Sequence, residues 1–414
     1  MGEPAQSLEH LITCEKHPSK GRTRRRCGRI GGQRMGSPEA ERVKAQDRAT
    51  DVFVIGGGPA GLAAAIAARQ KGFSVTVADG AAPAIDKPCG EGLMPEAIAA
   101  LEELGVSLGE TARNRFRGIR FVENQLHVAA DFPHGSGMGV RRTVLHELLI
   151  RRAEACGVDI LWKMPVVAIG ANGVHLTDGE VTARWIIGAD GSASRVRKWS
   201  GLDGAAPETR RWATRRHYRI RPWSDYMEIH WGRRAQGYVT AVSPEEVSVV
   251  VIAETREGAR FESAMNELPQ LRERIADAEV LGRERGAVTE TKTFRRVSRG
   301  NLALVGDASG GVDAITGEGM RLAFQQALAL ADAMEAGNLK SYEIRHRQMA
   351  RRPLWMGRLM LQLGRNVWLR RRAMRALAET PGLFERMMAI HVGHATPREI
   401  VWAGAEMGWQ FLAT

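Results

Sequence analysis

The amino-acid sequence predicts an α/β fold in which a parallel sheet is joined to an antiparallel sheet and a helical C-terminal region. Residues 51–79, DVFVIGGGPAGLAAAIAARQKGFSVTVAD, run from an apolar strand through a glycine turn and an alanine-rich helix into a second strand. This βαβ unit requires parallel strand pairing. Residues 212–254 interleave aromatic and charged side chains and end in VSVVVIAE, a pattern typical of antiparallel strands. From Tyr342 onward, apolar residues mostly follow a helical period.

The individual elements follow from local signals. Asp51–Ile55 is a short apolar run that ends at glycine, as expected of a buried parallel strand. Leu62–Lys71 contains strong helix formers, and Gly72 ends it before the strand Ser74–Ala78. The same criteria predict later helices at Arg142–Cys156 and Gly319–Met334, and strands at Val158–Trp162, Trp185–Ile187 and Asn301–Val305.

The composition is that of a soluble globular protein. The chain has 414 residues, 44% hydrophobic and 26% charged, with mean hydropathy −0.26, and this length predicts two or three domains. No apolar run approaches the ~18 residues of a membrane-spanning helix, and the N-terminus lacks the apolar stretch of a secretory signal. The four cysteines form no CxxC pair. This argues against disulfides and a zinc site, so we expect no metal and a cytoplasmic location.

The formal charge of +12 is regional. Residues 1–49 predict a disordered basic extension, and a start at Met35 would leave residues 1–34 untranslated. Ten arginines and no acidic residue lie between Ile344 and Ala378, with apolar residues among them. This pattern predicts either an amphipathic helix on the inner face of an anionic membrane or a lid with solvated arginines. No nucleic-acid reading motif accompanies the charge, so we expect no nucleic-acid partner.

The glycine turn after the first strand carries the clearest chemical signal. Gly56, Gly58 and Gly61 form GxGxxG, with Pro59 and Ala60 between the last two. These glycines permit a tight turn, close approach of a pyrophosphate and close packing of helix on strand. Asp79 ends the second strand, where a carboxylate can accept hydrogen bonds from ribose hydroxyls. The sequence therefore predicts a dinucleotide site.

Four motifs in order give the chain a family resemblance. They are GGGPAGLAAA, the helix that begins at Arg142, GADGSASRVR, and LVGDASGGVDAITGEGM. Over about residues 50–335 the sequence resembles the FAD-dependent oxidoreductases of the p-hydroxybenzoate hydroxylase and geranylgeranyl reductase superfamily. The resemblance implies a Rossmann-like FAD-binding domain, interrupted by an antiparallel β-sheet substrate domain.

The resemblance also implies roles for single residues. It places Arg142 at the FAD pyrophosphate, Asp190 of the DGxxSxxR motif at the FAD–NAD(P)H region, and Gly306-Asp307 at the ribityl chain. Gly317 and Gly319 would present amides to the flavin pyrimidine edge. Ser194 and Arg197 are either structural or ligands. The loop KPCGEGL resembles the reductase branch, which places Cys89 and Gly90 beside the isoalloxazine; the alternative for Cys89 is a buried inert thiol.

The predicted domain organisation follows these motifs. The segments are a disordered extension (1–49), the first part of the FAD-binding domain (50–130), its second part with the DG motif (131–205), the substrate sheet (206–290), the third FAD part (291–340) and the helical region (341–414).

The predicted function is that of an FAD-dependent oxidoreductase. The leading hypothesis is an NAD(P)H-dependent monooxygenase of an apolar aromatic, polyketide-like or isoprenoid small molecule. The alternative is a flavin reductase of isoprenoid or activated C=C bonds, and a remote third is a non-enzymatic membrane- or nucleic-acid-binding protein. No second GxGxxG occurs, so NAD(P)H docks transiently or a separate donor supplies electrons. No acid–base residue is fixed; the candidates are Glu91, Tyr218, Tyr226 and Tyr238.

Overall fold

The computed structural model describes residues 48–109, 114–204, 206–380 and 382–393, and the single residues 398, 402, 405, 406 and 408. All of them belong to one structural unit, Lys44–Thr414. The predicted extension 1–49 lies outside the described residues, except for its last two positions. These two open the first strand, which begins at Arg48 rather than at Asp51.

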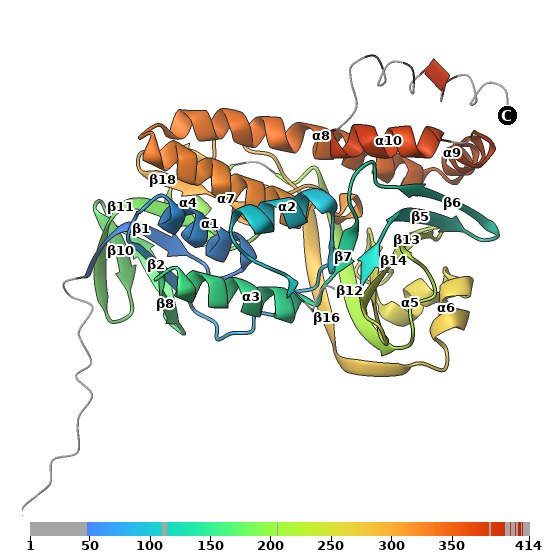
Figure 1. Cartoon of the computed structure of the whole chain (residues 1–414), viewed down its shortest axis with the longest axis horizontal. Coiled ribbons are helices and arrows are strands. Elements are labelled where there is room, and N and C mark those ends of the chain that lie inside the picture. Colours follow the sequence, from blue (N-terminus) through green and yellow to red (C-terminus); the bar gives the residue numbers. More distant parts are fainter. Residues whose placement is uncertain are drawn as a thin grey trace, which may run out of the picture. The chain divides into compact units, whose positions relative to one another are not determined.

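The first sheet is parallel at its centre, as predicted (Figure 1). Its middle strand, β1 (Arg48–Ile55), lies between β2 (Val75–Asp79) and β11 (Gly179–Gly188). The outer strands are β8 (Asp159–Trp162), parallel to β2; β18 (Leu302–Leu304), parallel to β11; and the antiparallel β9 (Val166–Ile169), β10 (Gly173–Leu176) and β17 (Ser298–Arg299). The carboxyl ends of the parallel strands meet at one edge, which is where such sheets bind ligands.

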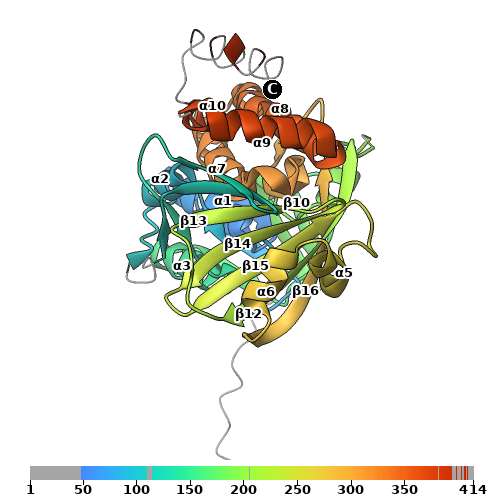
Figure 2. The ribbon, with the colours of Figure 1, turned by 90° about the vertical axis from the view of Figure 1, so that its right-hand side faces the viewer.

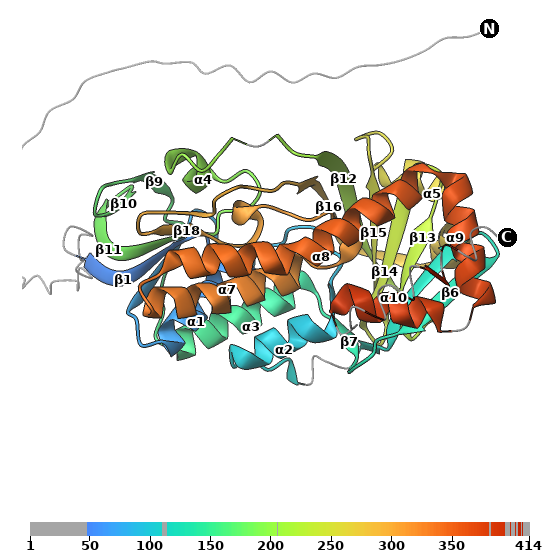
Figure 3. The ribbon, with the colours of Figure 1, turned by 90° about the horizontal axis from the view of Figure 1, so that it is seen from above.

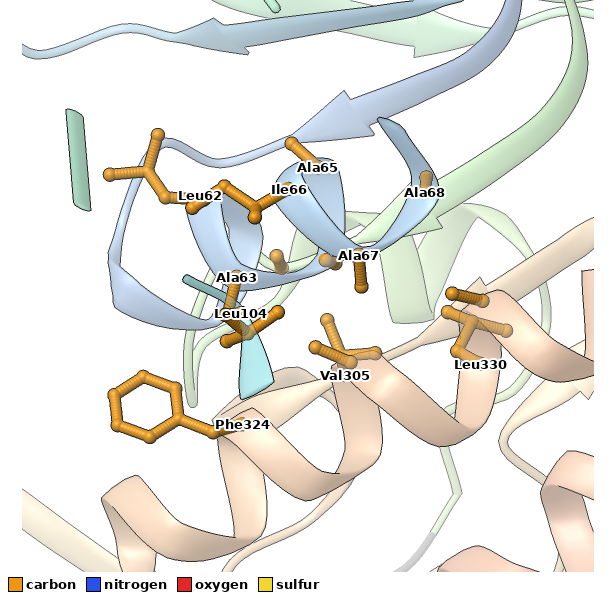
Figure 4. Packing of buried hydrophobic residues seen from close by; sticks show 14 of the residues in the cluster. Leu62, Ala63, Ala65, Ile66, Ala67, Ala68, Leu104, Val305, Phe324 and Leu330 are labelled. Atoms are coloured by element: carbon orange, nitrogen blue, oxygen red, sulfur yellow. The ribbon is translucent and has the colours of Figure 1, made fainter. Parts of the chain in front are cut away.

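A layer of helices covers this sheet, and its members are α1 (Pro59–Gln70), α2 (Pro95–Glu103), α3 (Arg142–Ala155) and α7 (Gly319–Glu335). Leu62 and Ile66 of α1 are fully buried, as is Phe324 of α7. Figure 4 shows Ala63 and Ala67 on the side of α1 that faces Phe324 and Leu330 of α7, and these small side chains allow the two helices to approach closely. This packing fixes the N-termini of α1 and α7 near the carboxyl edge of the sheet.

The second sheet has the strand order β16-β12-β15-β14-β13-β5-β6. Its strands are β5 (Gly118–Glu123), β6 (Leu126–Asp131), β12 (Thr209–Arg219), β13 (Tyr226–Trp231), β14 (Ala235–Ser243), β15 (Glu246–Ala253) and β16 (Glu279–Thr291). Neighbours are antiparallel, as predicted, except that β13 and β5 are parallel. The alternation of strand residues therefore gives this sheet two distinct faces.

Strands β5 and β6 belong to the second sheet, whereas sequence analysis assigned them to the first part of the FAD-binding domain. Ile119 and Phe121 of β5 are buried in the same cluster as Ile229 of β13. The apolar residues of β5 thus pack in the core of the second sheet, because β5 pairs in parallel with β13, which lies far along the chain. Local alternation predicts a strand but does not identify its partner.

Helices cover both faces of the second sheet (Figures 2 and 3). One face carries the short helices α5 (Phe261–Asn266) and α6 (Pro269–Ile275), and the other carries α8 (Leu339–Arg365), α9 (Val367–Glu379) and α10 (Leu383–Val392). Beneath α8–α10 lies a methionine-rich cluster in which Phe121 and Phe384 stack with ring centroids 4.8 Å apart. Within the described ranges, no helix is long and apolar enough to cross a membrane.

Smaller elements join the two sheets. They are a sheet of β3 (Gly92–Leu93), β4 (Arg115–Phe116) and β7 (Gly137–Gly139), the helix α4 (Arg195–Trp199), and the 3₁₀ turns Gly306–Ser309 and Ala314–Thr316. They surround the space between the sheets.

Candidate active site

A cavity of about 600 Å³ lies where the carboxyl edge of the first sheet meets the second sheet. Of the residues that sequence analysis assigned to the cofactor, all but one line it: Gly56, Gly58, Pro59, Ala60, Asp79, Cys89, Gly90, Arg142, Asp190, Gly306, Asp307, Gly317 and Gly319. The exception, Gly61, follows Ala60 in the first turn of α1. The fold thus gathers segments that are far apart in the chain around one space.

The three glycines after β1 occupy different environments. Gly56 has φ +112°, and a Cβ there would lie 2.5 Å from the carbonyl oxygen of Ala189. A Cβ on Gly61 would lie 1.8 Å from the carbonyl oxygen of Gly56, so helix α1 requires glycine at this close approach. Gly58 faces the open cavity, and a Cβ added there would meet no heavy atom of the described residues within 4 Å. The first and third glycines shape the turn, and the second leaves space for a ligand.

Asp79 and His146 hold this turn. Asp79 Oδ2 accepts a 2.7 Å hydrogen bond from the amide of Gly57, at the end of β2 where the carboxylate also borders the cavity. His146 of α3 lies 2.7 Å from the Gly57 carbonyl through Nε2, and its Nδ1 accepts from the Ile85 amide. Burial lowers the pKa of His146, so the neutral ring donates through Nε2. Sequence analysis missed His146; its position four residues after Arg142 on one helix face was the available signal.

Arg142 begins α3 and borders the cavity. Its Nε is buried and has no hydrogen-bond partner among the described residues, while its Nη1 lies 3.9 Å from Met320 Sδ, a weak acceptor. A half-buried guanidinium that has no carboxylate partner among the described residues is suited to bind an anion, because unpaired charge away from water is costly. The residue could therefore bind a phosphate group.

Glu91 anchors the loop that sequence analysis placed beside the isoalloxazine. Its carboxylate is almost fully buried and accepts from the Arg142 amide at 2.8 Å, from Arg215 Nη1 at 3.0 Å and from His217 Nε2 at 2.6 Å. Burial opposes its ionisation, but the hydrogen bond and charge of His217 and the charge of Arg215 outweigh it, so the pKa of Glu91 lies below its ordinary value. Both oxygens are engaged, which makes Glu91 a structural anchor rather than an acid.

Ion pairs of two arginines connect strand β12 to the part of the cavity wall that lies on the side of the first sheet. Arg215 also contacts Asp86 at 2.6 Å. Four residues earlier on the strand, Arg211 Nη1 contacts Asp313 Oδ1 at 2.9 Å, and both side chains are buried. Ala213, between the two arginines on the same strand face, lines the cavity. Sequence analysis identified neither arginine, because their partners are far away in the chain.

Asp307 and Cys89 also line the cavity. Lys87 Nζ contacts Asp307 Oδ2 at 2.7 Å. Burial opposes ionisation of Asp307, but Lys87 outweighs it and the pKa of the carboxyl is lowered. Burial raises the pKa of the Cys89 thiol, against the opposing charge of Arg142, so Cys89 stays protonated. An ionised carboxylate and a neutral thiol thus border the same space.

The segment before α7 is held by the C-terminal helices. Gly317 has φ +67° and Gly319 begins α7, so this turn needs glycine and directs the helix N-terminus at the cavity. Between them, Glu318 is buried and contacts His391 of α10 at 3.0 Å and Arg321. Burial opposes ionisation of Glu318, and the hydrogen bond and charge of His391 lower its pKa nonetheless. Helix α10 therefore bears directly on the cavity wall.

The DG motif has a mainly structural arrangement. Asp190 Oδ2 caps α4 by accepting hydrogen bonds from the amides of Arg195 and Val196. Asp190 also lines the cavity, and its other oxygen, Oδ1, has no hydrogen-bond partner among the described residues. Ser194 Oγ accepts from the Arg197 amide, and the buried Arg197 donates to Ala308 and Ser192 carbonyls and to Asp203. These contacts brace the turn that carries Asp307.

The three tyrosine candidates are separated by the second sheet. Tyr238 of β14 lines the cavity, and its buried hydroxyl has no hydrogen-bond partner among the described residues. Burial raises its pKa, so it is a protonated donor. Tyr218 packs on Phe261 on the other face, and the Tyr226 hydroxyl contacts Asp131 at 2.8 Å. Around Tyr238 the cavity wall is apolar, formed by Ala213, Met227, Val250, Ile252 and Val288.

The sheet edge, glycine turn and cavity define a dinucleotide-binding α/β protein with a second sheet over its site. The chain belongs to the FAD binding domain family, whose model matches residues 49–338. It is an FAD-dependent oxidoreductase of the superfamily that includes p-hydroxybenzoate hydroxylase and geranylgeranyl reductase.

Similar proteins carry different activities. Menaquinone reductase of Mycobacterium tuberculosis (strain ATCC 25618 / H37Rv) is 29% identical over 352 residues, which cover 79% of this chain and 83% of the relative. The 3-(3-hydroxy-phenyl)propionate/3-hydroxycinnamic acid hydroxylase of Mycobacterium avium (strain 104) is 29% identical over 189 residues, 38% of this chain and 32% of the relative. The fold resembles the crystal structure of a geranylgeranyl bacteriochlorophyll reductase-like protein of Thermoplasma acidophilum, with TM-score 0.67, 19% identity and coverage of 88% and 98% of the two chains.

Proposed function

We propose that the protein is an FAD-dependent reductase of a long apolar molecule with a ring oxygen, of the isoprenoid-quinone class, with NAD(P)H as electron donor. The observation that carries this proposal is the continuity of the cavity. It runs from the residues expected to hold FAD to an apolar wall interrupted by the unpartnered hydroxyl of Tyr238. The reductase relative, which matches most of the chain, supports the same reaction class.

The lining fits FAD in several independent respects. Gly58 leaves open space at the turn, Asp79 borders it for a ribose, and Arg142 supplies an unpaired guanidinium for the pyrophosphate. Asp307 is ionised and accepts hydrogen bonds, as a ribityl chain requires. The N-terminus of α7 faces the space with its partial positive charge. Bound FAD supplies transfer of two electrons between NAD(P)H and substrate.

Replacing Arg142 by alanine is expected to weaken FAD binding roughly 10- to 150-fold, because a charge-assisted hydrogen bond to phosphate contributes about 1.5–3 kcal/mol. FAD titration of the apoprotein, followed by flavin fluorescence, measures this. Arg151→Ala on the same helix is the matched control, since Arg151 is exposed and pairs with Glu147. Equal FAD affinity in the two variants would show that Arg142 does not contribute to FAD binding.

The substrate side of the cavity requires little polar chemistry from the protein. Apolar side chains exclude water from a long hydrocarbon chain, and Tyr238 donates to an oxygen on the substrate ring. Reduction places a hydride and a proton on the substrate. Among the side chains that line the cavity, the Tyr238 hydroxyl and the Cys89 thiol are neutral groups that keep their proton, because burial raises the pKa of both.

Replacing Tyr238 by phenylalanine is expected to raise KM for an oxygen-bearing substrate about three- to tenfold, the worth of one hydrogen bond. Stability should be unchanged or slightly higher, because the variant removes a buried hydroxyl that has no partner among the described residues. Steady-state kinetics and thermal unfolding measure both quantities. Tyr218→Phe, on the opposite sheet face, is the control and should leave KM unaltered.

A second function, hydroxylation by NAD(P)H and O₂, is favoured by the hydroxylase relative that matches part of the chain. Anaerobic turnover with an isoprenoid quinone and NAD(P)H, followed by mass spectrometry, separates the two. The reductase proceeds without oxygen and adds two hydrogen atoms per NAD(P)H oxidised. The hydroxylase requires air and adds one oxygen atom. If NAD(P)H is oxidised but neither an isoprenoid quinone nor a simple phenol is modified, both candidate functions are contradicted.

A further inference from the structure

The outward side of α8 and α9 carries a stripe of arginine and large apolar residues. Along α8 the exposed positions recur at helical spacing, and along α9 they continue in the same way. We call this surface the Arg–Trp face and define it as Ile344, Arg347, Arg351, Trp355, Trp368, Arg371 and Arg375. In Figure 3, which looks at the molecule from above, α8 crosses over strands of the second sheet and α9 follows it at the end of that sheet.

The apolar members of this face are unusually exposed. Trp355 is 56% exposed, Trp368 is 62% exposed and Ile344 is 54% exposed. The inner side of the same helices is buried through residues such as Met360 and Met374. The tryptophans are therefore not needed to hold α8 and α9 on the sheet, and water contact with such large apolar groups is unfavourable.

Only part of the positive charge on these helices is neutralised. Four arginines pair with acids of other elements: Arg345 with Asp332, Arg358 with Glu208, Arg365 with Glu254 and Arg370 with Glu123. Arg351 and Arg375 are exposed and have no acidic partner among the described residues. Arg371 is 56% exposed and lies 3.6 Å from Glu123, which is already paired. The Arg–Trp face thus keeps a net positive charge.

We propose that the Arg–Trp face docks the protein on an anionic lipid bilayer. Arginines attract the acidic headgroups, and tryptophans enter the interfacial region where their apolar rings and polar N–H groups are both accommodated. A bilayer is favoured over a nucleic acid because the exposed apolar residues include Ile344, which offers no ring for a base to stack on. The proposal is independent of which reaction the protein catalyses.

The test is co-sedimentation of the full FAD-loaded protein with vesicles. Phosphatidylcholine vesicles with and without phosphatidylglycerol are compared at about 0.1 M and about 1 M salt, where the screening length falls from about 10 Å to about 3 Å. We expect binding to the anionic vesicles at low salt and its loss at high salt. Failure to bind anionic vesicles, or equal binding to neutral ones, would overturn the proposal.

Two variants assign the binding to this surface. Arg351→Glu with Arg375→Glu should weaken binding at least about 25-fold, since each arginine near an anionic leaflet contributes about fivefold. The charge-matched control is Arg272→Glu with Arg274→Glu on α6, on the opposite face of the second sheet. It should bind as the parent does. Equal loss in both double variants would mean a general charge effect and contradict the proposal.

Tryptophan insertion has its own readout. Lipids brominated near the headgroup should quench the fluorescence of the parent protein, and Trp355→Ala with Trp368→Ala should remove that quenching. Flavin content reports whether each variant is folded. Quenching that persists without both tryptophans, in a variant with full flavin content, would place the membrane contact elsewhere and reject this surface.

Discussion

Replacing Glu91 by glutamine is expected to lower the free energy of unfolding by about 3–5 kcal/mol, the usual cost of breaking a buried ion pair by removing one partner. The carboxylate accepts from Arg215, His217 and the Arg142 amide, and glutamine leaves the buried Arg215 with only Asp86. Urea unfolding measures the change. Glu279→Gln is the control, because its partner Arg219 lies on the same strand as Arg215 but the Arg219–Glu279 contact is exposed, and such pairs contribute at most about 1 kcal/mol. Similar losses in both variants would contradict the anchoring role of Glu91.

Glu91 is also expected to make the unfolding free energy depend on pH in the acid range. The pKa of Glu91 is lower in the folded protein than its ordinary value of 4.5. The stabilisation is therefore fully present above that ordinary value and is lost as the pH falls toward the folded-state pKa. The difference in unfolding free energy between the parent and Glu91→Gln should thus narrow in acid. A difference that stays constant from neutral pH to well below the ordinary value would show that folding does not lower the pKa of Glu91.

Replacing Gly58 by alanine is expected to leave the apoprotein stable and yet weaken FAD binding roughly 5- to 150-fold. Gly58 has ordinary extended backbone angles, and its Cβ would meet no atom of the described residues within 4 Å. The added methyl group instead occupies ligand space, where overpacking costs about 1–3 kcal/mol. FAD titration and apoprotein melting are compared in one series.

Gly61→Ala is the matched contrast, because its Cβ would lie 1.8 Å from the Gly56 carbonyl oxygen. That variant should lose apoprotein stability together with FAD. If Gly58→Ala bound FAD as tightly as the parent, the dinucleotide would not cross the turn at this point.

Residues whose roles depend on local sequence were predictable. The glycine turn, Asp79 and the strand–helix–strand order follow from side chains close together in the chain, because backbone conformation and βαβ pairing are set locally. The resemblance supplied Arg142, Asp190 and Asp307, and the structure lines one cavity with all of them. Their contacts with FAD stay predictions.

Residues whose roles depend on distant partners were not predictable. Arg215 and Glu91 are far apart in the sequence and become neighbours only when β12 crosses the loop. Strand β5 shows the same limit, since its alternation fits any sheet with an apolar face. Among the tyrosines, only the register of β14 places Tyr238 at the cavity, and a shift of one residue would turn it away.

The two attachments of β12 brace one wall of the cavity. With Arg211 bound to Asp313 and Arg215 bound to Glu91 and Asp86, the walls on either side of Ala213 cannot part without breaking buried ion pairs. We therefore expect the width of the cavity at Ala213 to change little when a ligand binds.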